Sequence, residues 1–239
     1  MSDHLSTTIS LFDKSVTRVN SRAVHASLKA SASFTTIKRS IDIVGALFLI
    51  VSLAPVLALV AIAILIKGGA GPIIYRHQRV GRGGRPFICL KFRTMCPEAD
   101  RILGELLARD PTARAEWERT QKLRRDPRIS PIGRLLRATS LDELPQLWNV
   151  LRGEMSLVGP RPVTSEEMRK WYEALGGATS YMAVRPGITG LWQVSGRNRT
   201  TYESRVSLDC RYVENLCLRN DALILFRTFG VVARRDGAC

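Results

Sequence analysis

Apolar residues form one uninterrupted segment from Ile43 to Ile66, and its 24 residues include no charged side chain. A straight helix of this length, at about 1.5 Å per residue, would cross a hydrocarbon core of about 30 Å. A helix buried in a soluble core usually carries a polar stripe, and a cleaved signal peptide has a shorter apolar segment nearer the N-terminus. The pattern therefore predicts a membrane helix over residues 38–67.

The flanks of this segment and the proline inside it indicate how it enters the membrane. Lys38 and Arg39 precede it and further cations follow it, so the charge asymmetry that orients a spanning helix is weak. Pro55 removes a backbone hydrogen bond in the middle of the segment and predicts a kink. We therefore expect a re-entrant helix that bends at Pro55 and returns to the same side. Asp42 is expected to form an ion pair with Arg39 or Lys38 at the membrane entry.

The segments on either side of the membrane helix are polar or mixed. Residues 1–37 are rich in Ser, Thr and Ala and predict a basic, mobile tail, with a short lipid-binding amphipathic helix as the alternative. Residues 68–239 have the pattern of a soluble domain of mixed helices and strands. Within it, PIIYRHQRVG and RPFICLKFRTM are rich in β-forming residues and are separated by a turn-prone segment, so they predict a β-hairpin.

Helices are expected to make up most of this second part. Two are predicted over residues 97–109 and 111–124, with Asp110 as the N-cap of the second. DPRISPIGRLLRATS then reads as a basic connector. Residues 219–235 predict a basic amphipathic helix that lies at the lipid interface or packs on the core. The predicted fold class is α+β and mostly helical, with a re-entrant membrane helix hairpin, a small β-hairpin and interfacial helices.

Two adjacent carboxylates, Asp142 and Glu143, begin the segment LDELPQLWNVLRG. Ser140 and Glu143 have the spacing of a capping box, which predicts a helix from about Ser140 to Gly153. Pro145 fits that start poorly, so the alternative is a helix that begins at Pro145 with the carboxylates in the preceding turn. In both versions we expect the helix dipole to keep Asp142 ionised.

Charge and composition narrow the classes of partner. The 239-residue chain is 45% hydrophobic, which excludes a wholly disordered protein, and its net charge of +15 indicates an anionic partner. Nucleic acid, an acidic membrane surface and phosphorylated substrates all meet that condition. The five cysteines match no zinc spacing and are expected to be free thiols.

Arginines surround the carboxylate pair. Arg134 and Arg137 come shortly before it, and Arg152 and Arg161 follow. An acidic pair at a helix start is commonly only a cap. Clustered arginines, however, hold phosphate oxygens through paired hydrogen bonds, so the surroundings favour a reactive pair in an anion-binding pocket.

Several stretches in order carry a family resemblance. They are KRSIDIVGALFLIVSLAP, QRVGRGGRPFICLKFRTM, RATSLDELPQLWNVLRGEMSLVGPRP, RPGITGLWQVSGRN and the spaced Asp209, Tyr212, Asn215 and Asp221. Residues 38 to about 235 resemble the bacterial sugar transferases, small monotopic polyprenyl-phosphate phosphoglycosyl transferases. The resemblance implies a re-entrant membrane helix. One departure is Ala54, where the family often has Ser before the kinking proline.

The resemblance also implies an activity and its location. The expected reaction transfers a hexose 1-phosphate from a UDP-sugar to undecaprenyl phosphate with Mg²⁺, and it begins exopolysaccharide or glycan synthesis. The expected place is the cytoplasmic face of the bacterial inner membrane, on an anionic lipid bilayer. The sugar stays open among glucose, galactose and N-acetylated hexosamines, with a lean to glucose or galactose. The oligomeric state, including a homo-oligomer, also stays open.

Residue roles follow from position in the matching motifs. Asp142 is expected to attack the sugar-bearing phosphorus and form a covalent aspartyl phosphosugar, with Glu143 holding the metal or positioning the second nucleophile. Both carboxylates are candidate Mg²⁺ ligands. The candidate phosphate and nucleotide ligands are Arg137, Lys91, Arg93, Arg161, Arg185, Gln193 and Arg197. Gly187 and Gly190 are expected to lie in a loop that approaches the nucleotide or sugar.

Two alternatives remain at this point. Within the same reaction, a single-step transfer in a ternary complex would need no covalent intermediate. In a different class, the chain would be a membrane-tethered basic binding protein without catalysis. No helix-turn-helix or stacking-aromatic signature is visible in the sequence, so we expect no nucleic-acid partner.

Overall fold

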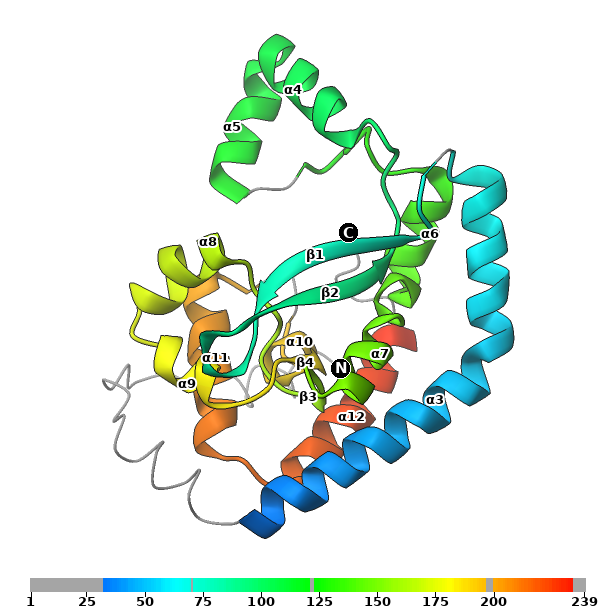
Figure 1. Ribbon diagram of the computed structural model, residues 1–239. Coiled ribbons are helices and arrows are strands. Elements are labelled where there is room, and N and C mark those ends of the chain that lie inside the picture. Colours follow the sequence, from blue (N-terminus) through cyan, green and yellow to red (C-terminus); the bar gives the residue numbers. More distant parts are fainter. Residues whose placement is uncertain (1–31, 70, 121–122, 197–199, 234–239) are drawn as a thin grey trace, which may run out of the picture.

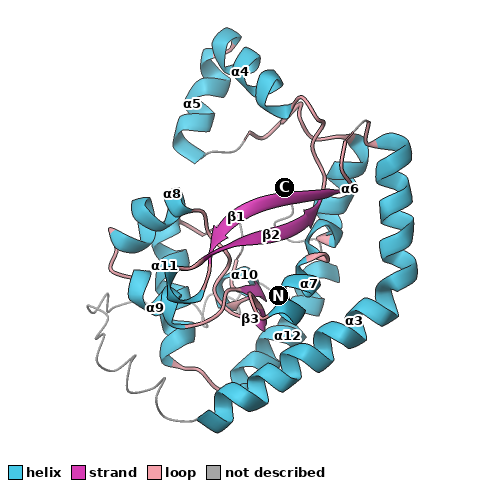
Figure 2. Ribbon diagram, viewed as in Figure 1, coloured by secondary structure: helices cyan, strands magenta, loops and turns pink. Residues whose placement is uncertain are grey.

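A computed structural model describes residues 32–69, 71–120, 123–196 and 200–233 (Figure 1). The tail expected over residues 1–37 therefore lies outside the described residues up to residue 31. The described chain is mostly helical and carries two small sheets, each of two strands (Figure 2). The α+β, mostly helical class predicted from the sequence is confirmed.

The membrane-helix candidate forms α3, Ala32–Lys67, and includes Pro55. Its ribbon changes direction midway and runs along one side of the molecule (Figure 1). By length and composition, it is the one helix in the described chain that could cross a membrane. Its most apolar 18-residue window has a mean hydropathy of 3.0 and is only 11% buried, unlike the central helix of a soluble core.

The predicted hairpin is present. Strand β1, Ile74–Val80, pairs antiparallel with β2, Pro86–Phe92, across a short 3-10 helix, Arg82–Gly84. Tyr75 lies opposite Lys91 in this register. Since opposite residues of an antiparallel pair share a face, these two side chains lie on the same side of the hairpin.

Two helices follow the hairpin and project away from the rest of the molecule (Figure 1). They are α4, Ala99–Arg109, and α5, Pro111–Thr120. Asp110 Oδ1 accepts hydrogen bonds from the backbone N–H groups of Thr112 and Ala113, at 2.8 and 3.1 Å. The predicted N-cap is confirmed, because these bonds satisfy amides that lack a partner inside the helix.

The segment expected to be a basic connector is instead a helix, α6, Pro131–Thr139. Ser130 caps it, accepting a hydrogen bond from the Gly133 amide, and Pro131 occupies its first turn. These are ordinary helix-start signals, and they prevail here over the basic composition. Ser140 ends α6 in the left-handed conformation, with φ of 58°.

The second of the two versions of the carboxylate segment is observed. Ser140 is the C-cap of α6 and not an N-cap, so no capping box forms with Glu143. The carboxylates lie in a 3-10 helix, Leu141–Glu143, and α7 then covers Gln146–Arg152. Gly153 ends α7 with φ of 82°, as its sequence position predicts.

The remaining chain folds into short elements around one parallel strand pair. The pair is β3, Ser156–Val158, and β4, Gly187–Thr189. The others are α8, Ser165–Glu167, a π-helix, Met168–Glu173, α9, Ala178–Ala183, α10, Leu191–Val194, α11, Tyr202–Glu214, and α12, Leu218–Ala233.

Gly187 and Gly190, expected in a loop that approaches the nucleotide or sugar, allow backbone to pack closely on backbone. A Cβ on Gly187 would lie 2.1 Å from the Gly159 nitrogen, and one on Gly190 would lie 2.2 Å from the Gly159 oxygen. Real Cβ atoms do not approach that closely, so a side chain at either position would force the turn after β3 away. The expected loop is corrected, since the segment forms β4 and α10, and its approach to a nucleotide or sugar stays a prediction.

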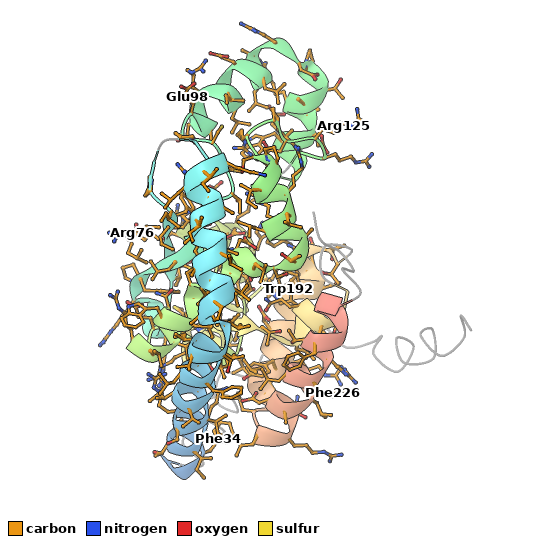
Figure 3. The ribbon with its side chains drawn as sticks, turned by 90° about the vertical axis from the view of Figure 1, so that its right-hand side faces the viewer. Phe34, Arg76, Glu98, Arg125, Trp192 and Phe226 are labelled. Carbon is orange, nitrogen blue, oxygen red and sulfur yellow. The ribbon has the colours of Figure 1, made fainter. Side chains whose placement is uncertain are left out.

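The C-terminal helix α12 packs on the core, one of the two alternatives left open by its sequence, and its position at a lipid interface stays a prediction. Ile224 is 3% exposed and packs in the main core, whereas Phe226 and Phe229 are 77% and 72% exposed. Figure 3 shows Phe226 beside α12, on the side of the molecule along which α3 runs. One face of α12 therefore packs inward and the other presents aromatic rings outward.

The membrane-entry residues have partners other than those expected. Asp42 is not paired with Lys38 or Arg39; its Oδ1 accepts hydrogen bonds from Ser156 Oγ and the Leu157 amide, both at 3.0 Å. Asp42 is only 3% exposed, so these donors compensate for its burial. The expected ion pair within α3 gives way to a contact between α3 and β3.

Lys38 and the spaced motif near the C-terminus form a second contact with α3. Lys38 Nζ lies 2.6 Å from Asp221 Oδ2 and donates to the Val158 carbonyl at 3.1 Å. Tyr212 donates to the other oxygen of Asp221 at 2.8 Å. The first turns of α3 are thus fastened to α12, α11 and β3.

Candidate active site

Glu143 is held by two cations. Its Oε1 accepts from Lys91 Nζ at 2.8 Å and from Arg161 Nη2 at 2.9 Å. Burial alone would raise the pKa of Glu143, but the charges and hydrogen bonds of Arg161 and Lys91 hold it well below its usual range. Glu143 is therefore an anion at any physiological pH and joins the hairpin to the turn after β3.

Asp142 has a different environment. Among the described residues its carboxyl group receives no hydrogen bond, and it is partly exposed. Burial and the charge of Glu143 raise the pKa of Asp142 to about 6, against the opposing charges of Lys91, Arg137 and Arg161. At pH 7 roughly 90% of such a group is ionised. Burial and the Glu143 charge thus act against the ionised form expected from the sequence, although that form still predominates at pH 7.

Arg137 reaches the same region from the last turn of α6. Its Nε donates to Thr94 Oγ1 at 3.0 Å, and its charge acts on Asp142. Arg93, by contrast, contacts a different part of the chain. Its side chain is 8% exposed and donates to the Gly69 carbonyl at 2.8 Å, so it joins β2 to the segment after α3.

Arg185 lies at the opposite end of α7 from the carboxylates. Its Nε donates to the Gly153 carbonyl at 2.8 Å. Arg39 donates to the carbonyls of Val150 and Leu151 in the same last turn, at 2.7 and 3.0 Å. These two arginines satisfy carbonyls that the helix end leaves open. The structure therefore does not bring Arg185 to the carboxylate pair.

The last two candidate ligands, Gln193 and Arg197, are not part of the cluster that the structure describes around the carboxylate pair. Gln193 donates from Nε2 to the Ile188 carbonyl at 2.8 Å, which supports the backbone of β4. Arg197 lies outside the described residues. The cluster that the structure assembles around Asp142 and Glu143 thus contains Lys91, Arg137 and Arg161.

Sequence reasoning missed a second polar group beside this cluster. Arg79 Nη1 lies 2.8 Å from Glu167 Oε2, and Arg79 Nη2 lies 3.1 Å from His77 Nδ1. Tyr202 donates to the other oxygen of Glu167 at 2.8 Å. The available signal was strand alternation, because His77 and Arg79 follow Tyr75 at every second position on the face that carries Lys91.

Asp209, one of the spaced motif residues, is part of the interior. It is 1% exposed and accepts from the Tyr172 hydroxyl at 2.7 Å. Burial raises the pKa of Asp209 to about 8, so the group is largely neutral at pH 7. It is a buried support for the elements behind the site.

The carboxylate pair fits a magnesium ion in chemical type. Within the described ranges no group of three or more His, Cys, Asp or Glu residues gathers to hold a metal. Mg²⁺ does not need such a group, since it is commonly bound by one or two carboxylates together with substrate phosphate oxygens. Asp142 and Glu143 are adjacent oxygen donors, and Glu143 Oε1 is the one oxygen already engaged by cations.

The cysteines agree with the sequence reading. Cys89, Cys96, Cys210 and Cys217, the four within the described ranges, are free thiols. No disulfide therefore involves these four residues.

Comparison with known proteins gives a family. A family model described as bacterial sugar transferase matches residues 33–235. The chain is 54% identical over 209 residues to a UDP-galactose-lipid carrier transferase of Erwinia amylovora and 50% identical over 209 residues to an undecaprenyl-phosphate galactose phosphotransferase of Salmonella typhimurium. It is 46% identical over 201 residues to the exopolysaccharide production protein ExoY of Sinorhizobium fredii.

The lengths covered differ among these relatives. The matches take in 87% of this chain and 43% of each of the two galactose-named relatives. For the ExoY protein they take in 84% of this chain and 87% of the relative. The chain thus spans less than half of the first two relatives and most of the third.

Proposed function

The chain belongs to the bacterial sugar transferase family, and from this premise we propose that it transfers a hexose 1-phosphate from a UDP-sugar to undecaprenyl phosphate, releasing UMP. The observation that carries the proposal is an unbonded carboxylate, Asp142, beside a carboxylate that two cations hold in place. Galactose is the first sugar to test, since two relatives are named for it. The product would begin exopolysaccharide or glycan synthesis.

The proposed reaction has two steps. An Asp142 oxygen attacks the phosphorus that carries the sugar, the bond from that phosphorus to the bridging oxygen breaks, and UMP leaves. The phosphate oxygen of undecaprenyl phosphate then attacks the aspartyl phosphosugar, and Asp142 leaves as a carboxylate. Lys91, Arg137 and Arg161 face anionic oxygens in both steps and reduce the repulsion between nucleophile and electrophile.

Glu143 and a magnesium ion are assigned supporting roles. Oε1 of Glu143 keeps Lys91 and Arg161 in place, and its second oxygen, with Asp142, would hold Mg²⁺ on the diphosphate. Such an ion, when bound, neutralises charge on the diphosphate and on the departing UMP.

The membrane placement is also a proposal. We place α3 in the lipid bilayer as a re-entrant helix, with the catalytic domain at the cytoplasmic face of the bacterial inner membrane. Its support is the exposure of large apolar side chains on α3, among them Val44, Phe48 and Ile66 at 67%, 67% and 74%. The exposed Phe226 and Phe229 of α12 would lie in the interface of an anionic bilayer.

The test of the mechanism omits the lipid acceptor. Full-length enzyme is incubated with labelled UDP-galactose, UDP-glucose or UDP-N-acetylhexosamines, and UMP release is measured together with the mass of the Asp142 peptide. We expect one equivalent of UMP, a phosphohexose adduct on Asp142, and transfer of the label to undecaprenyl phosphate added later.

Matched variants separate the roles of the two carboxylates and the competing routes. Asp142→Asn should abolish UMP release, whereas Glu143→Gln should leave some of the first step. Turnover that requires both substrates together, with no adduct at full activity, would replace the two-step route by a single ternary complex. If none of the UDP-sugars yields UMP, the proposed function would be rejected in favour of a membrane-tethered binding protein without catalysis.

A further inference from the structure

The face of strand β1 that carries His77 and Arg79 also carries an aromatic residue, which lies beside Lys91. Tyr75 lies opposite Lys91 in the strand register, and Lys91 Nζ contacts Glu143 at 2.8 Å. Opposite residues have Cβ atoms about 5 Å apart, so the Tyr75 side chain leaves the hairpin beside the side chain of Lys91, whose ammonium group reaches Glu143. Tyr75 is 50% exposed, and Arg76, the next residue of β1, lies on the opposite face of the strand because side chains alternate.

His77 borders the same ring with a defined hydrogen-bonding character. The two ring centroids are 5.6 Å apart, and the planes are tilted by 57°. Arg79 Nη2 lies 3.1 Å from His77 Nδ1, and a guanidinium group can only donate. His77 Nδ1 is therefore the acceptor, and the neutral ring carries its proton on Nε2. That N–H is a donor on the side of the ring away from Arg79.

Two other aromatic rings, Tyr202 and Trp192, are already covered. Tyr202 is sandwiched between Trp171, with centroids 4.6 Å apart, and the Arg205 guanidinium, 4.8 Å from its ring centre. Trp192 is 6% exposed and has Arg205 4.7 Å from its ring centre. Tyr75 therefore offers an aromatic face to a ligand where these rings do not.

We propose that Tyr75 and His77 form the subsite for the hexose ring of the sugar nucleotide. The inference rests on the proposed function, because attack by Asp142 on the sugar-bearing phosphorus puts the hexose directly beside that carboxylate. The uracil is separated from the same phosphorus by a second phosphate and a ribose. Pyranose rings present a C–H face that packs on an aromatic ring, and their hydroxyl groups accept hydrogen bonds from an N–H donor.

The test compares the binding of UDP-galactose with that of UDP. Full-length protein in detergent, carrying Asp142→Asn to prevent turnover, is titrated calorimetrically with each ligand. In this background Tyr75→Ala should weaken UDP-galactose about ten-fold and change the affinity for UDP less than two-fold. Tyr75→Phe keeps the ring and should retain the affinity. Arg76→Ala, on the opposite face of the strand, is the matched control and should change neither.

Two variants of His77 test its proposed role as an N–H donor. His77→Ala should weaken UDP-galactose several-fold, and His77→Gln, which keeps an N–H donor, should recover most of the loss. Equal weakening of UDP and UDP-galactose by Tyr75→Ala would overturn the assignment, since the ring would then bind the nucleotide. So would unchanged affinities in both alanine variants when the parent binds UDP-galactose. Absence of UMP release from every UDP-sugar by the protein with Asp142 intact would instead reject the proposed function itself.

Discussion

Asp142 and Glu143 are neighbours in sequence, yet their carboxyl groups are tuned in opposite directions. Burial and the Glu143 charge raise the pKa of Asp142, whereas Arg161 and Lys91 lower that of Glu143 despite its burial. Titratable pairs whose pKa values are pushed apart usually have different roles. The more basic Asp142 carboxylate suits the nucleophile, and the permanently charged Glu143 suits the fixed anion that orders the cations.

The first prediction concerns pH. With a pKa of about 6, Asp142 loses its charge as the pH falls, so the rate of UMP release without lipid acceptor should be half its plateau near pH 6. It should fall about ten-fold for each further pH unit and stay flat above pH 7. Rapid-quench measurement from pH 4.5 to 8 checks this. In Glu143→Gln the midpoint should move to lower pH, and a flat profile over that range in the parent enzyme would contradict the assignment.

A second prediction separates two arginines of α6. Arg137 is held by Thr94 and its charge reaches Asp142, whereas Arg134 is exposed on the same helix. Arg137→Ala should lower turnover by roughly two to three orders of magnitude, the scale of losing one preorganised charge-stabilising donor. Arg134→Ala should retain turnover within about two-fold. Similar turnover in both variants, with unchanged thermal midpoints, would reduce Arg137 to a surface charge.

At the scale of elements, α6 positions the reactive turn through one close contact. A Cβ on Gly133 would lie 1.9 Å from the Thr94 carbonyl oxygen, so α6 packs directly on the backbone that follows β2. Ser140 then takes a left-handed conformation and turns the chain into the carboxylate segment. Such backbone strain costs about 1 kcal/mol and tends to occur at functional sites.

The third prediction tests this contact. Gly133→Ala should push α6 from Thr94, lower the thermal midpoint by several degrees and reduce turnover, because Arg137 moves with the helix. The matched control is Gly104→Ala on α4, where a Cβ would meet no atom within 4 Å. That change should preserve activity and stabilise the protein slightly through helix propensity. A Gly133→Ala protein as active and stable as its parent would contradict the tight packing.

At the scale of the whole molecule, both arms of α3 pack on the same domain. Before Pro55, Ala46 is buried in the main core. After Pro55, Val60 and Ile64 pack with Leu136 of α6. A straight spanning helix would carry its second arm away from those partners. The bend therefore supports a re-entrant path, in which the two ends of α3 lie on one side of the bilayer.

The fourth prediction tests that path in membranes. In the parent protein, single cysteines near residue 30 and in α5 should both label from the cytoplasmic side. Pro55→Ala restores the missing backbone hydrogen bond and should straighten α3, so a fraction of molecules should show the N-terminal cysteine on the opposite side. Ala54→Ser leaves the proline in place and should label like the parent. Opposite-side labelling in the parent would reject re-entrance.

Local patterns were sufficient for several elements of this protein. The apolar segment, the hairpin, the Asp110 cap and the Gly153 helix end each depend on residues close together in the chain. The sequence did mark the start of α6 with Ser130 and Pro131, but the basic composition of the segment is also typical of a connector. The packing of Gly187 and Gly190 could not be predicted for a different reason, since their close contact with Gly159 depends on tertiary structure.

The sequence by itself determined the acidic pair, the surplus of cations and the apolar helix with its central proline, because propensity and periodicity are local properties. Only the tertiary structure decided which cations meet which acids. Asp42 bonds to residues more than a hundred positions away, and Lys38 pairs with Asp221 rather than with its helical neighbour. Buried charges take whichever partners packing brings within hydrogen-bonding distance, and that choice depends on how the whole chain folds.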